Sequence, residues 1–275
     1  MVKFIPTPIG NIEDITIRAL REFEKTTLFL CEDTRKTKQL LILLKERLNL
    51  KYPQNAEFIS FHEHNGKDRL KELEYRLKRE DAVYVSDAGT PNISDPGQLL
   101  VEFCQRENIA YDVLPGATAL TTAYCASGFK NGQFIFFGFL PPKGGKRRET
   151  LLKVMKSEFD SILYEAPHRV EKLIEEISLI DKNRELFLAK ELTKLHQNYY
   201  RGLAKDILRE FKLLRLNSRG EWVILIKSKT LQDKSIGVED ILNMDIPIKL
   251  KSKLLSKITD YSSKEWYKRL NINSK

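Results

Sequence analysis

The sequence predicts an α/β protein with two α/β domains and a small helical C-terminal extension. Three observations support this fold class. Short runs of β-branched and aromatic residues alternate with longer amphipathic segments from the start of the chain, which is typical of sheets covered by helices. A Pro-Gly step at residues 115–116 interrupts the alternation, which begins again after Gly128. The residues after 229 are polar, lysine-rich and helical in pattern.

Five strands are expected in the first domain, with helices between them. The strand-like runs are Val2–Ile5, Thr27–Cys31, Glu57–Phe61, Ala82–Ser86 and Tyr111–Leu114. Leucines at helical spacing mark the intervening segments, most clearly over residues 68–79 and 40–48. Because strands and helices alternate, we expect a parallel sheet with helices on both faces. This domain is predicted to span residues 1–116.

A second α/β domain is expected over residues 117–229, joined to the first through a short linker near residues 115–121. It begins with a helix rich in small residues, Ala117–Ser127. The strand-like runs that follow are Phe134–Phe139, Ser161–Glu165, Leu186–Lys190 and Trp222–Lys227, with helices over residues 169–180 and 203–216. Residues 230–275 form the predicted basic helical extension, in which apolar positions are sparse.

The composition excludes several classes of protein. The chain has 275 residues, of which 41% are hydrophobic and 31% charged, so it can form a globular core. No apolar run approaches the roughly 20 residues needed to span a bilayer, and the first residues lack the pattern of a secretory signal. The three cysteines, Cys31, Cys104 and Cys125, have no metal-site spacing and are expected to be reduced. We therefore expect a cytoplasmic protein without a bound metal or a membrane span.

Basic residues are concentrated in two stretches of the chain. Overall there are 47 Lys and Arg against 38 Asp and Glu, a formal net charge of +9. The stretch Lys143–Lys156 holds six basic residues and one acid, and the stretch Ile246–Lys275 holds eight basic residues and two acids. A solvated basic surface is one interpretation. The clustering favours the other, which is binding of a polyanion such as RNA.

Three loops that follow strands have compositions typical of ligand sites. In open α/β sheets, ligands bind beyond the carboxyl ends of the strands. The loop Ser86–Gly97 combines small residues with two prolines, two aspartates and two glycines. The loops Pro6–Thr16 and Pro115–Leu120 occupy equivalent positions, and an alternative role for Asp14 is to cap the helix that follows. The sequence has neither a G-x-G-x-x-G after a strand nor a P-loop, which argues against a dinucleotide dehydrogenase or a P-loop enzyme.

Eight segments occur in an order that resembles one known family. They are Thr7–Thr16, Cys31–Arg35, Phe61–Asn65, Ser86–Gly97, Pro115–Leu120, Phe137–Pro141, Tyr164–Arg169 and Lys190–Lys194. Together they resemble the ribosomal RNA small subunit methyltransferase I family, the 2′-O-ribose cytidine methyltransferases of 16S rRNA in the tetrapyrrole-methylase superfamily. The resemblance covers residues 1–228. Ala166 stands where a serine is usual in the family, and Lys190 where an arginine is usual.

The resemblance implies two α/β domains of the tetrapyrrole-methylase type, with S-adenosylmethionine bound in the cleft between them. Carried over by motif, the residues expected to hold this methyl donor are Pro8, Ile9, Asp87, Ala88, Gly89, Thr90, Ser94, Asp95, Thr118, Ala119, Tyr164, Glu165 and Ala189. The family also implies a cytidine in the decoding region of the small ribosomal subunit as methyl acceptor. It further implies a homodimer.

Methyl transfer to a ribose hydroxyl depends on alignment of the acceptor oxygen, and a nearby base would assist it. The residues do not single out that base, and the candidates in or near the motif loops are Glu13, Asp14, His62, Glu63, Lys190 and Glu191. For contacts to RNA phosphates we expect Arg35 and Arg169, with a structural salt bridge as the alternative. We also expect Lys146, Arg147 and Arg148 of the first basic stretch to bind RNA.

Two other functions stay open at this point. One is C-methylation of a tetrapyrrole, such as a uroporphyrinogen or a precorrin, by an enzyme of the same superfamily. The basic stretches argue against it, as does the first loop, which is Gly-rich in tetrapyrrole enzymes. The other is a ribosome-associated binding protein without catalysis, and the intact loop motifs argue against that.

Overall fold

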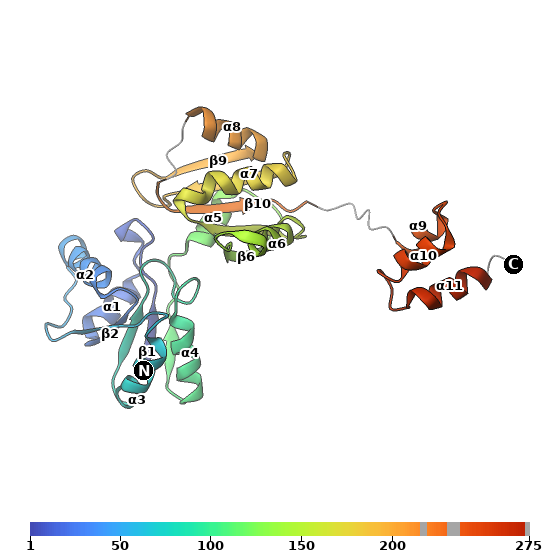
Figure 1. Cartoon of the computed structure of the whole chain (residues 1–275). Coiled ribbons are helices and arrows are strands. Elements are labelled where there is room, and N and C mark those ends of the chain that lie inside the picture. The colour runs from blue at the N-terminus through green and yellow to red at the C-terminus, as the bar shows by residue number, and fades with distance from the viewer. Residues whose placement is uncertain (215–218, 230–236, 273–275) are drawn as a thin grey trace. The chain divides into compact units, whose positions relative to one another are not determined.

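Five parallel strands form the first sheet in the computed structural model of the chain, which describes residues 1–214, 219–229 and 237–272 (Figure 1). The strands are β1 (Val2–Ile5), β2 (Leu28–Cys31), β3 (Glu57–Ser60), β4 (Ala82–Val85) and β5 (Tyr111–Val113), in the spatial order β3-β2-β4-β1-β5. The five strand predictions are confirmed, each within one residue. Because all neighbours are parallel, the loops after the strands meet at one edge of the sheet.

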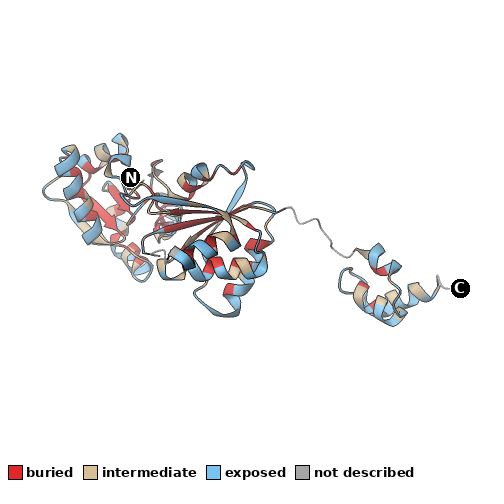
Figure 2. Ribbon diagram, turned by 90° about the horizontal axis from the view of Figure 1, so that it is seen from above, coloured by how far each residue is buried: buried red, intermediate tan, exposed pale blue. Residues whose placement is uncertain are grey.

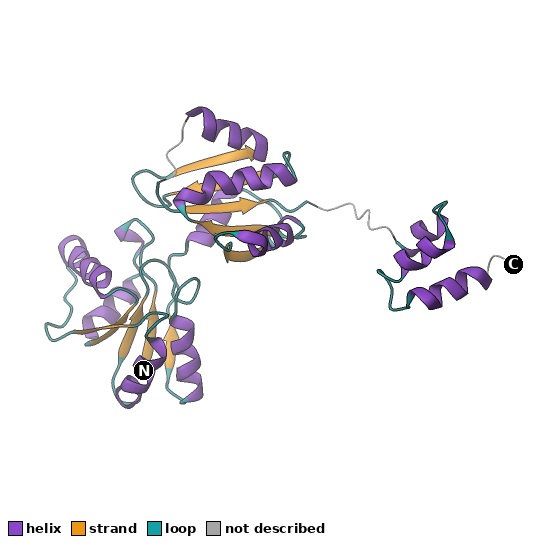
Figure 3. Cartoon of the chain, in the orientation of Figure 1, coloured by secondary structure: helices purple, strands orange, loops and turns teal. Residues whose placement is uncertain are grey.

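Helices cover both faces of this sheet, as predicted (Figure 3). On one face, α1 (Ile17–Lys25) and α2 (Thr34–Leu48) place Phe23 and Leu41 in the core cluster of Phe29. On the other, the side chains of α3 (Gly66–Leu77) and α4 (Gly97–Arg106) join the cluster of Phe4. Side chains alternate between the two faces of each strand, and because helices cover both faces, β2 and β4 are buried throughout. Figure 2 shows buried strands in red between the helices of this half of the chain.

The second sheet is mixed. Its strands are β6 (Phe134–Phe139), β7 (Asp160–Glu165), β8 (Glu185–Lys190), β9 (Asn198–Leu203) and β10 (Trp222–Ile226), in the order β6-β7-β10-β8-β9. β6 and β7 are parallel, whereas β10 is antiparallel to both of its neighbours and β9 is antiparallel to β8. The sequence prediction missed β9, because this edge strand is half exposed and lacks a run of buried β-branched residues.

Helices also cover both faces of the second sheet. α6 (Gly144–Met155), α7 (Val170–Ile180) and α8 (Ala204–Leu214) pack with β7, β8 and β10 in the largest core cluster. α5 (Ala119–Ser127) lies on the opposite face, where its Leu120 belongs to a cluster that also contains Ile9 and Leu192. Ile9 comes from the loop after β1, so this cluster joins the two α/β halves. The end of the helix predicted over 203–216 lies outside the described residues.

The chain divides into two units, residues 1–229 and residues 230–275. The second unit contains α9 (Val238–Asn243), α10 (Ile248–Leu255) and α11 (Ser263–Ile272), with Leu255 buried and the Trp266 Nε1 donating to the Thr259 hydroxyl at 2.6 Å. The two sheets fall on either side of residues 116–117, and that domain boundary stays a prediction. Every helix in the described ranges is too short or too polar to cross a bilayer.

The link between the two sheets depends on a close backbone approach at Gly116. A Cβ atom there would lie 2.5 Å from Pro6 Cβ, whereas a Cβ at Gly145 in α6 would meet nothing within 4 Å. We expect Gly116→Ala to lower the free energy of unfolding by about 1–3 kcal/mol through overpacking. Gly145→Ala should raise it by up to about 1 kcal/mol, because alanine favours helix. Urea unfolding of both variants checks this, and equal midpoints would contradict it.

Candidate active site

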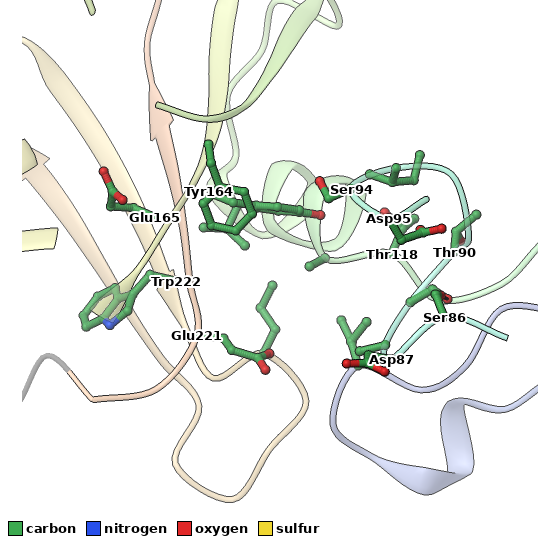
Figure 4. A pocket seen from close by; sticks show the side chains of 18 of the residues that line it. Ser86, Asp87, Thr90, Ser94, Asp95, Thr118, Tyr164, Glu165, Glu221 and Trp222 are labelled. Carbon is green, nitrogen blue, oxygen red and sulfur yellow. Dashed lines mark hydrogen bonds between the residues drawn. The ribbon is translucent and has the colours of Figure 1, made fainter. Parts of the chain in front are cut away.

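A cavity of about 450 Å³ opens at the carboxyl ends of β1 and β4 and faces the second sheet (Figure 4). From the first half of the chain it is lined by Ile9, Glu32, Ser86, Asp87, Ala88, Gly89, Thr90, Ile93, Ser94 and Asp95. From the second half it is lined by Thr118, Ala119, Phe139, Tyr164, Glu165, Ala166, Pro167, Leu192, Glu221, Trp222 and Val223. Its volume falls within the range of about 300–1,000 Å³ that is usual for small-molecule sites.

The loops after β1 and β4 are bonded to each other at the base of this cavity. The Thr7 amide donates to the Gly89 carbonyl at 3.0 Å, and the Gly89 amide donates to the Thr7 carbonyl at 3.1 Å. This antiparallel bridge requires a φ of +81° at Gly89, which a residue with a side chain rarely adopts. The Thr90 hydroxyl then donates to the Ala117 carbonyl at 3.0 Å. The loop after β4 is therefore fixed both to β1 and to the link between the sheets.

The carboxylate of Asp95 shapes the same loop from within. It accepts hydrogen bonds from the Tyr84 hydroxyl at 3.0 Å, the Asn92 amide at 2.7 Å and the Gly97 amide at 3.0 Å. Asn92 has a φ of +73°, a left-handed conformation that asparagine tolerates. Asp95 borders the cavity as predicted, but these three hydrogen bonds already occupy its carboxylate. Its contribution to the site is the shape of the loop.

At the start of this loop, Asp87 contacts Glu32 through its backbone and Lys36 through its side chain. The Asp87 amide donates to Glu32 Oε2 at 3.0 Å, and the Asp87 carboxylate forms an ion pair with Lys36 at 2.5 Å. Burial raises the pKa of Glu32 above its usual value, although the hydrogen bond from the Asp87 amide acts in the opposite direction. The sequence analysis did not select Glu32, even though it lies in the motif Cys31–Arg35 directly after β2.

Several buried polar atoms around the cavity have no hydrogen-bond partner among the residues that the structure describes. They are the hydroxyl oxygens of Thr7 and Thr118, Asp87 Oδ1 and Asn92 Oδ1. A buried polar atom left unpaired costs about 1–3 kcal/mol, so such atoms are expected where a polar ligand binds. Asp87 and Thr118 line the cavity directly, and apolar side chains that include Ile93 line it as well. An unpaired carboxylate oxygen, an unpaired hydroxyl and an apolar wall suit a ligand with an amino group, hydroxyls and an aromatic ring.

An aromatic wall at the end of β7 closes the far side of the cavity. The ring of Tyr164 lies 4.8 Å from that of Phe136 and 5.6 Å from that of Phe139, with both pairs edge to face. Burial raises the pKa of Tyr164 to about 12, so the phenol is neutral at physiological pH. Figure 4 shows its side chain turned into the cavity. Tyr164 can therefore offer both an apolar face and a hydroxyl to a ligand.

Glu165, Arg147 and Arg169 form a buried charged cluster behind this wall. The Glu165 side chain is fully buried, and its carboxylate lies 3.1 Å from Arg147 Nη1 and 2.6 Å from Arg169 Nη2. Arg147 is only 3% exposed and also pairs with Glu176 at 2.9 Å. Two of our expectations change as a result. The guanidinium of Arg147 is not available to RNA at the surface, and the carboxylate of Glu165 is occupied by arginines rather than open to a ligand. For Arg169, we considered an RNA phosphate contact and a structural salt bridge, and in this structure it forms a salt bridge with Glu165.

The other candidate bases lie away from the cavity lining. None of the six, Glu13, Asp14, His62, Glu63, Lys190 and Glu191, is among the described residues that line it. Glu13 and Asp14 are exposed in a 3-10 turn, and α1 is capped by Thr16 rather than by Asp14. Among the described residues, the acids that line the cavity are instead Glu32, Asp87, Asp95, Glu165 and Glu221. The sequence analysis did not select Glu32 and Glu221. Of the residues expected to hold the donor, Pro8 and Ala189 are not in the lining.

The remaining basic candidates are at the surface. The Arg35 side chain is 90% exposed and pairs with Asp33 at 2.8 Å. Lys146 and Arg148 are exposed on α6, on either side of the buried Arg147. Adjacent positions on a helix point about 100° apart, which explains why three consecutive basic residues divide between surface and core.

Comparison with known proteins agrees with the fold. Residues 1–208 match the family model of Tetrapyrrole (Corrin/Porphyrin) Methylases. A Helicobacter pylori protein named ribosomal RNA small subunit methyltransferase I is 41% identical over 97% of this chain and 96% of its own length. A Thermotoga maritima protein of the same name is 44% identical over 82% of this chain and 97% of its own length.

This chain belongs to the ribosomal RNA small subunit methyltransferase I family. It is therefore a methyltransferase with S-adenosylmethionine as its methyl donor. Among solved structures, diphthine synthase superimposes with a TM-score of 0.62 at 13% identity, over 83% of this chain and 90% of that one. Uroporphyrin-III C-methyltransferase from Thermus thermophilus, in complex with S-adenosyl homocysteine, has a TM-score of 0.55 at 15% identity, over 82% and 96%. The predicted tetrapyrrole-methylase fold is thus confirmed.

The structural role of Arg147 can be separated from a role in RNA binding. Arg147→Met removes one partner of a buried carboxylate, so we expect the free energy of unfolding to fall by about 3 kcal/mol or more. Arg148→Met alters an exposed side chain one residue away and should change it by less than about 0.5 kcal/mol. Denaturant unfolding of the two variants measures both values. A stable Arg147→Met variant with impaired RNA binding would restore the original expectation.

Proposed function

We propose that this chain methylates the ribose 2′-oxygen of a cytidine in 16S rRNA, in the decoding region of the small ribosomal subunit. The observation that carries the proposal is the cavity, because its unpaired polar atoms and apolar wall suit the methyl donor of the family. The relatives named ribosomal RNA small subunit methyltransferase I supply the class of acceptor. Because the proposed acceptor is ribosomal RNA, the cytoplasm is the compartment that we propose.

The donor would be held by the loops that the Thr7–Gly89 bridge fixes in place. Asp87 Oδ1 and the Thr118 hydroxyl are the unpaired atoms that can bind its amino group and hydroxyls. Backbone groups of residues 88–90 and the apolar side chains of Ile9 and Ile93 would enclose the rest. When bound, S-adenosylmethionine supplies an electrophilic methyl group. No residue of this chain needs to form a covalent bond with it.

Glu32 is the residue we propose as the base for the acceptor hydroxyl. Its carboxylate lines the cavity and accepts one hydrogen bond, from the Asp87 amide, and within the described part of the chain it forms no ion pair. Burial raises the pKa of Glu32, which makes its carboxylate a stronger base. A stronger base accepts the proton of the ribose hydroxyl more readily in the transition state. The other lining carboxylates have partners of their own. Asp95 accepts hydrogen bonds from its own loop, and Asp87 pairs with Lys36. Glu221 pairs with Lys194, and Glu165 pairs with two arginines. The proton of the ribose hydroxyl would pass to a Glu32 carboxylate oxygen.

Two surfaces of the chain are the proposed contacts to other molecules. The exposed basic residues of α6 and its flanks, Lys143, Lys146, Arg148, Lys153 and Lys156, would hold RNA phosphates, as would Arg35. The lysines of α10 and α11 belong to the second unit and would contact RNA independently. The edge strand β6 exposes Phe134, Ile135 and Phe139, and these apolar side chains support the proposed homodimer. Phe139 also lines the cavity, so a partner on β6 would lie beside the site.

The position of the methyl group tests the proposed reaction most directly. We expect 16S rRNA treated with the purified chain and S-adenosylmethionine to acquire one alkali-resistant linkage, because alkaline cleavage needs a free 2′-hydroxyl. A parallel reaction with uroporphyrinogen should give no methylated product. Mass mapping of nuclease fragments identifies the nucleotide. A methyl group on a base, or on the tetrapyrrole instead of the RNA, would contradict the proposal, and donor binding without transfer to either acceptor would support a binding protein.

A further inference from the structure

A second hollow, of about 310 Å³, adjoins the loops of the donor cavity. It is lined by Gly10, Asn11, Ile12, Leu43, Arg47, Thr193, Lys194 and Leu195. The two sites share two loops. In the first loop, Ile9 lines the cavity and the next residue, Gly10, lines the hollow. In the second loop, Leu192 lines the cavity and Thr193 lines the hollow. The third wall of the hollow is the C-terminal half of α2. No step proposed so far uses this hollow.

The walls of the hollow are held together by specific contacts. The Asn11 amide donates to the Thr193 hydroxyl at 2.9 Å, and a Cβ at Gly10 would lie 2.5 Å from Lys194 Cγ. Glu191 and Thr193 have φ values of +52° and +63°, a conformation that is costly for residues with side chains. Strain of this kind persists where the surrounding structure enforces it, and it is common at binding sites. The loop 191–194 is thus held in one defined shape.

The chemistry of the hollow combines cations with exposed apolar side chains. Arg47 contributes positive charge, and within the described part of the chain it forms no ion pair, whereas Lys194 is already paired with Glu191 and Glu221. Leu43 and Leu195 contribute apolar surface, and Leu195 is 93% exposed. α2 as a whole carries five basic residues and one acid. Proteins that bind single-stranded nucleic acid place cations at the phosphates and usually aromatic side chains at the bases, and in this hollow leucines occupy the place of the aromatic side chains.

One side of α2 connects the hollow with the donor cavity. Lys36, Leu43 and Arg47 are spaced by seven and four residues, so they lie along the same side of the helix. Lys36 pairs with Asp87, which lines the donor cavity, whereas Leu43 and Arg47 line the hollow. A chain of nucleotides along this side of α2 would therefore reach the cavity. A second copy of the protein fits less well, because a two-fold contact would place the basic α2 against itself.

We propose that this hollow binds one nucleotide of single-stranded RNA next to the nucleotide that is methylated, with Arg47 at its phosphate and Leu195 against its base. The inference rests on the proposed rRNA substrate and adds the surface that positions it. It concerns a site separate from the donor cavity. Binding of S-adenosylmethionine is consequently expected to be independent of Arg47 and Leu195.

Neutralising Arg47 tests the phosphate contact, with Lys45→Gln as the matched control on the opposite side of the same helix. In filter binding with 16S rRNA, Arg47→Gln should weaken affinity about tenfold. It should also reduce the slope of log affinity against log salt by about 0.7, the value for one phosphate contact to a single strand. Lys45→Gln should leave both unchanged, and calorimetric affinity for S-adenosylmethionine should be the same in all three proteins. Equal effects of the two variants, or no effect of Arg47→Gln, would overturn the proposal.

Leu195→Ser tests the apolar contact, with Leu179→Ser at another exposed leucine as its control. We expect Leu195→Ser to weaken RNA binding about fivefold or more with an unchanged salt slope, because no charge is removed. Leu179→Ser should bind RNA as the wild type does. If Leu195→Ser instead shifts the oligomeric state in sedimentation, the hollow is an interface between copies and the proposal fails. If the wild-type chain methylates no rRNA, the proposed function fails and this inference fails with it.

Discussion

The pair of backbone hydrogen bonds between Thr7 and Gly89 is the constraint on which the site depends. Parallel strands β1 and β4 bring their carboxyl ends side by side, but neighbouring strands alone do not determine the shape of the loops beyond them. The bridge does so, and it is possible because residue 89 is a glycine with a φ of +81°. From there the Thr90 hydroxyl reaches the Ala117 carbonyl. One bridge thereby sets the position of the loop after β4 against both the first sheet and the start of α5.

The carboxylates of the cavity differ in role because they differ in their partners. Asp95 accepts three hydrogen bonds from its own loop, and Glu165 lies between two arginines in the core. Within the described part of the chain, Asp87 keeps one oxygen unpaired in the cavity, and Glu32 accepts a single hydrogen bond at its edge. The first two therefore maintain the structure, whereas the second two remain available to ligands. Residue type alone does not distinguish these cases, since all four are acids in loops after strands or at a strand end.

Sequence patterns predicted the strands of the first sheet within one residue, because buried parallel strands are short apolar runs between amphipathic helices. They missed β9, whose half-exposed edge gives no such run. Motif positions identified most of the cavity lining, since loops after parallel strands converge at one edge. They could not separate Arg147 from Arg148, because burial depends on which side of α6 faces the core. Glu32 directly follows β2 within a motif, so the same reasoning could have selected it. Glu221 could not be selected, because only the folded chain brings the start of β10 to this cavity.

The affinity of Gly89→Ala for S-adenosylmethionine tests the central claim that the bridged loop holds the donor. Gly132→Ala is the matched control, because Gly132 has a similar φ of +66° and a Cβ there would meet nothing within 4 Å. Both substitutions impose a left-handed conformation on alanine, which costs about 1–2 kcal/mol, so both should lower thermal stability. Calorimetric titration should show about a tenfold loss of donor affinity for Gly89→Ala and none for Gly132→Ala. Unchanged affinity in a folded Gly89→Ala variant, or an equal loss in both, would contradict the account.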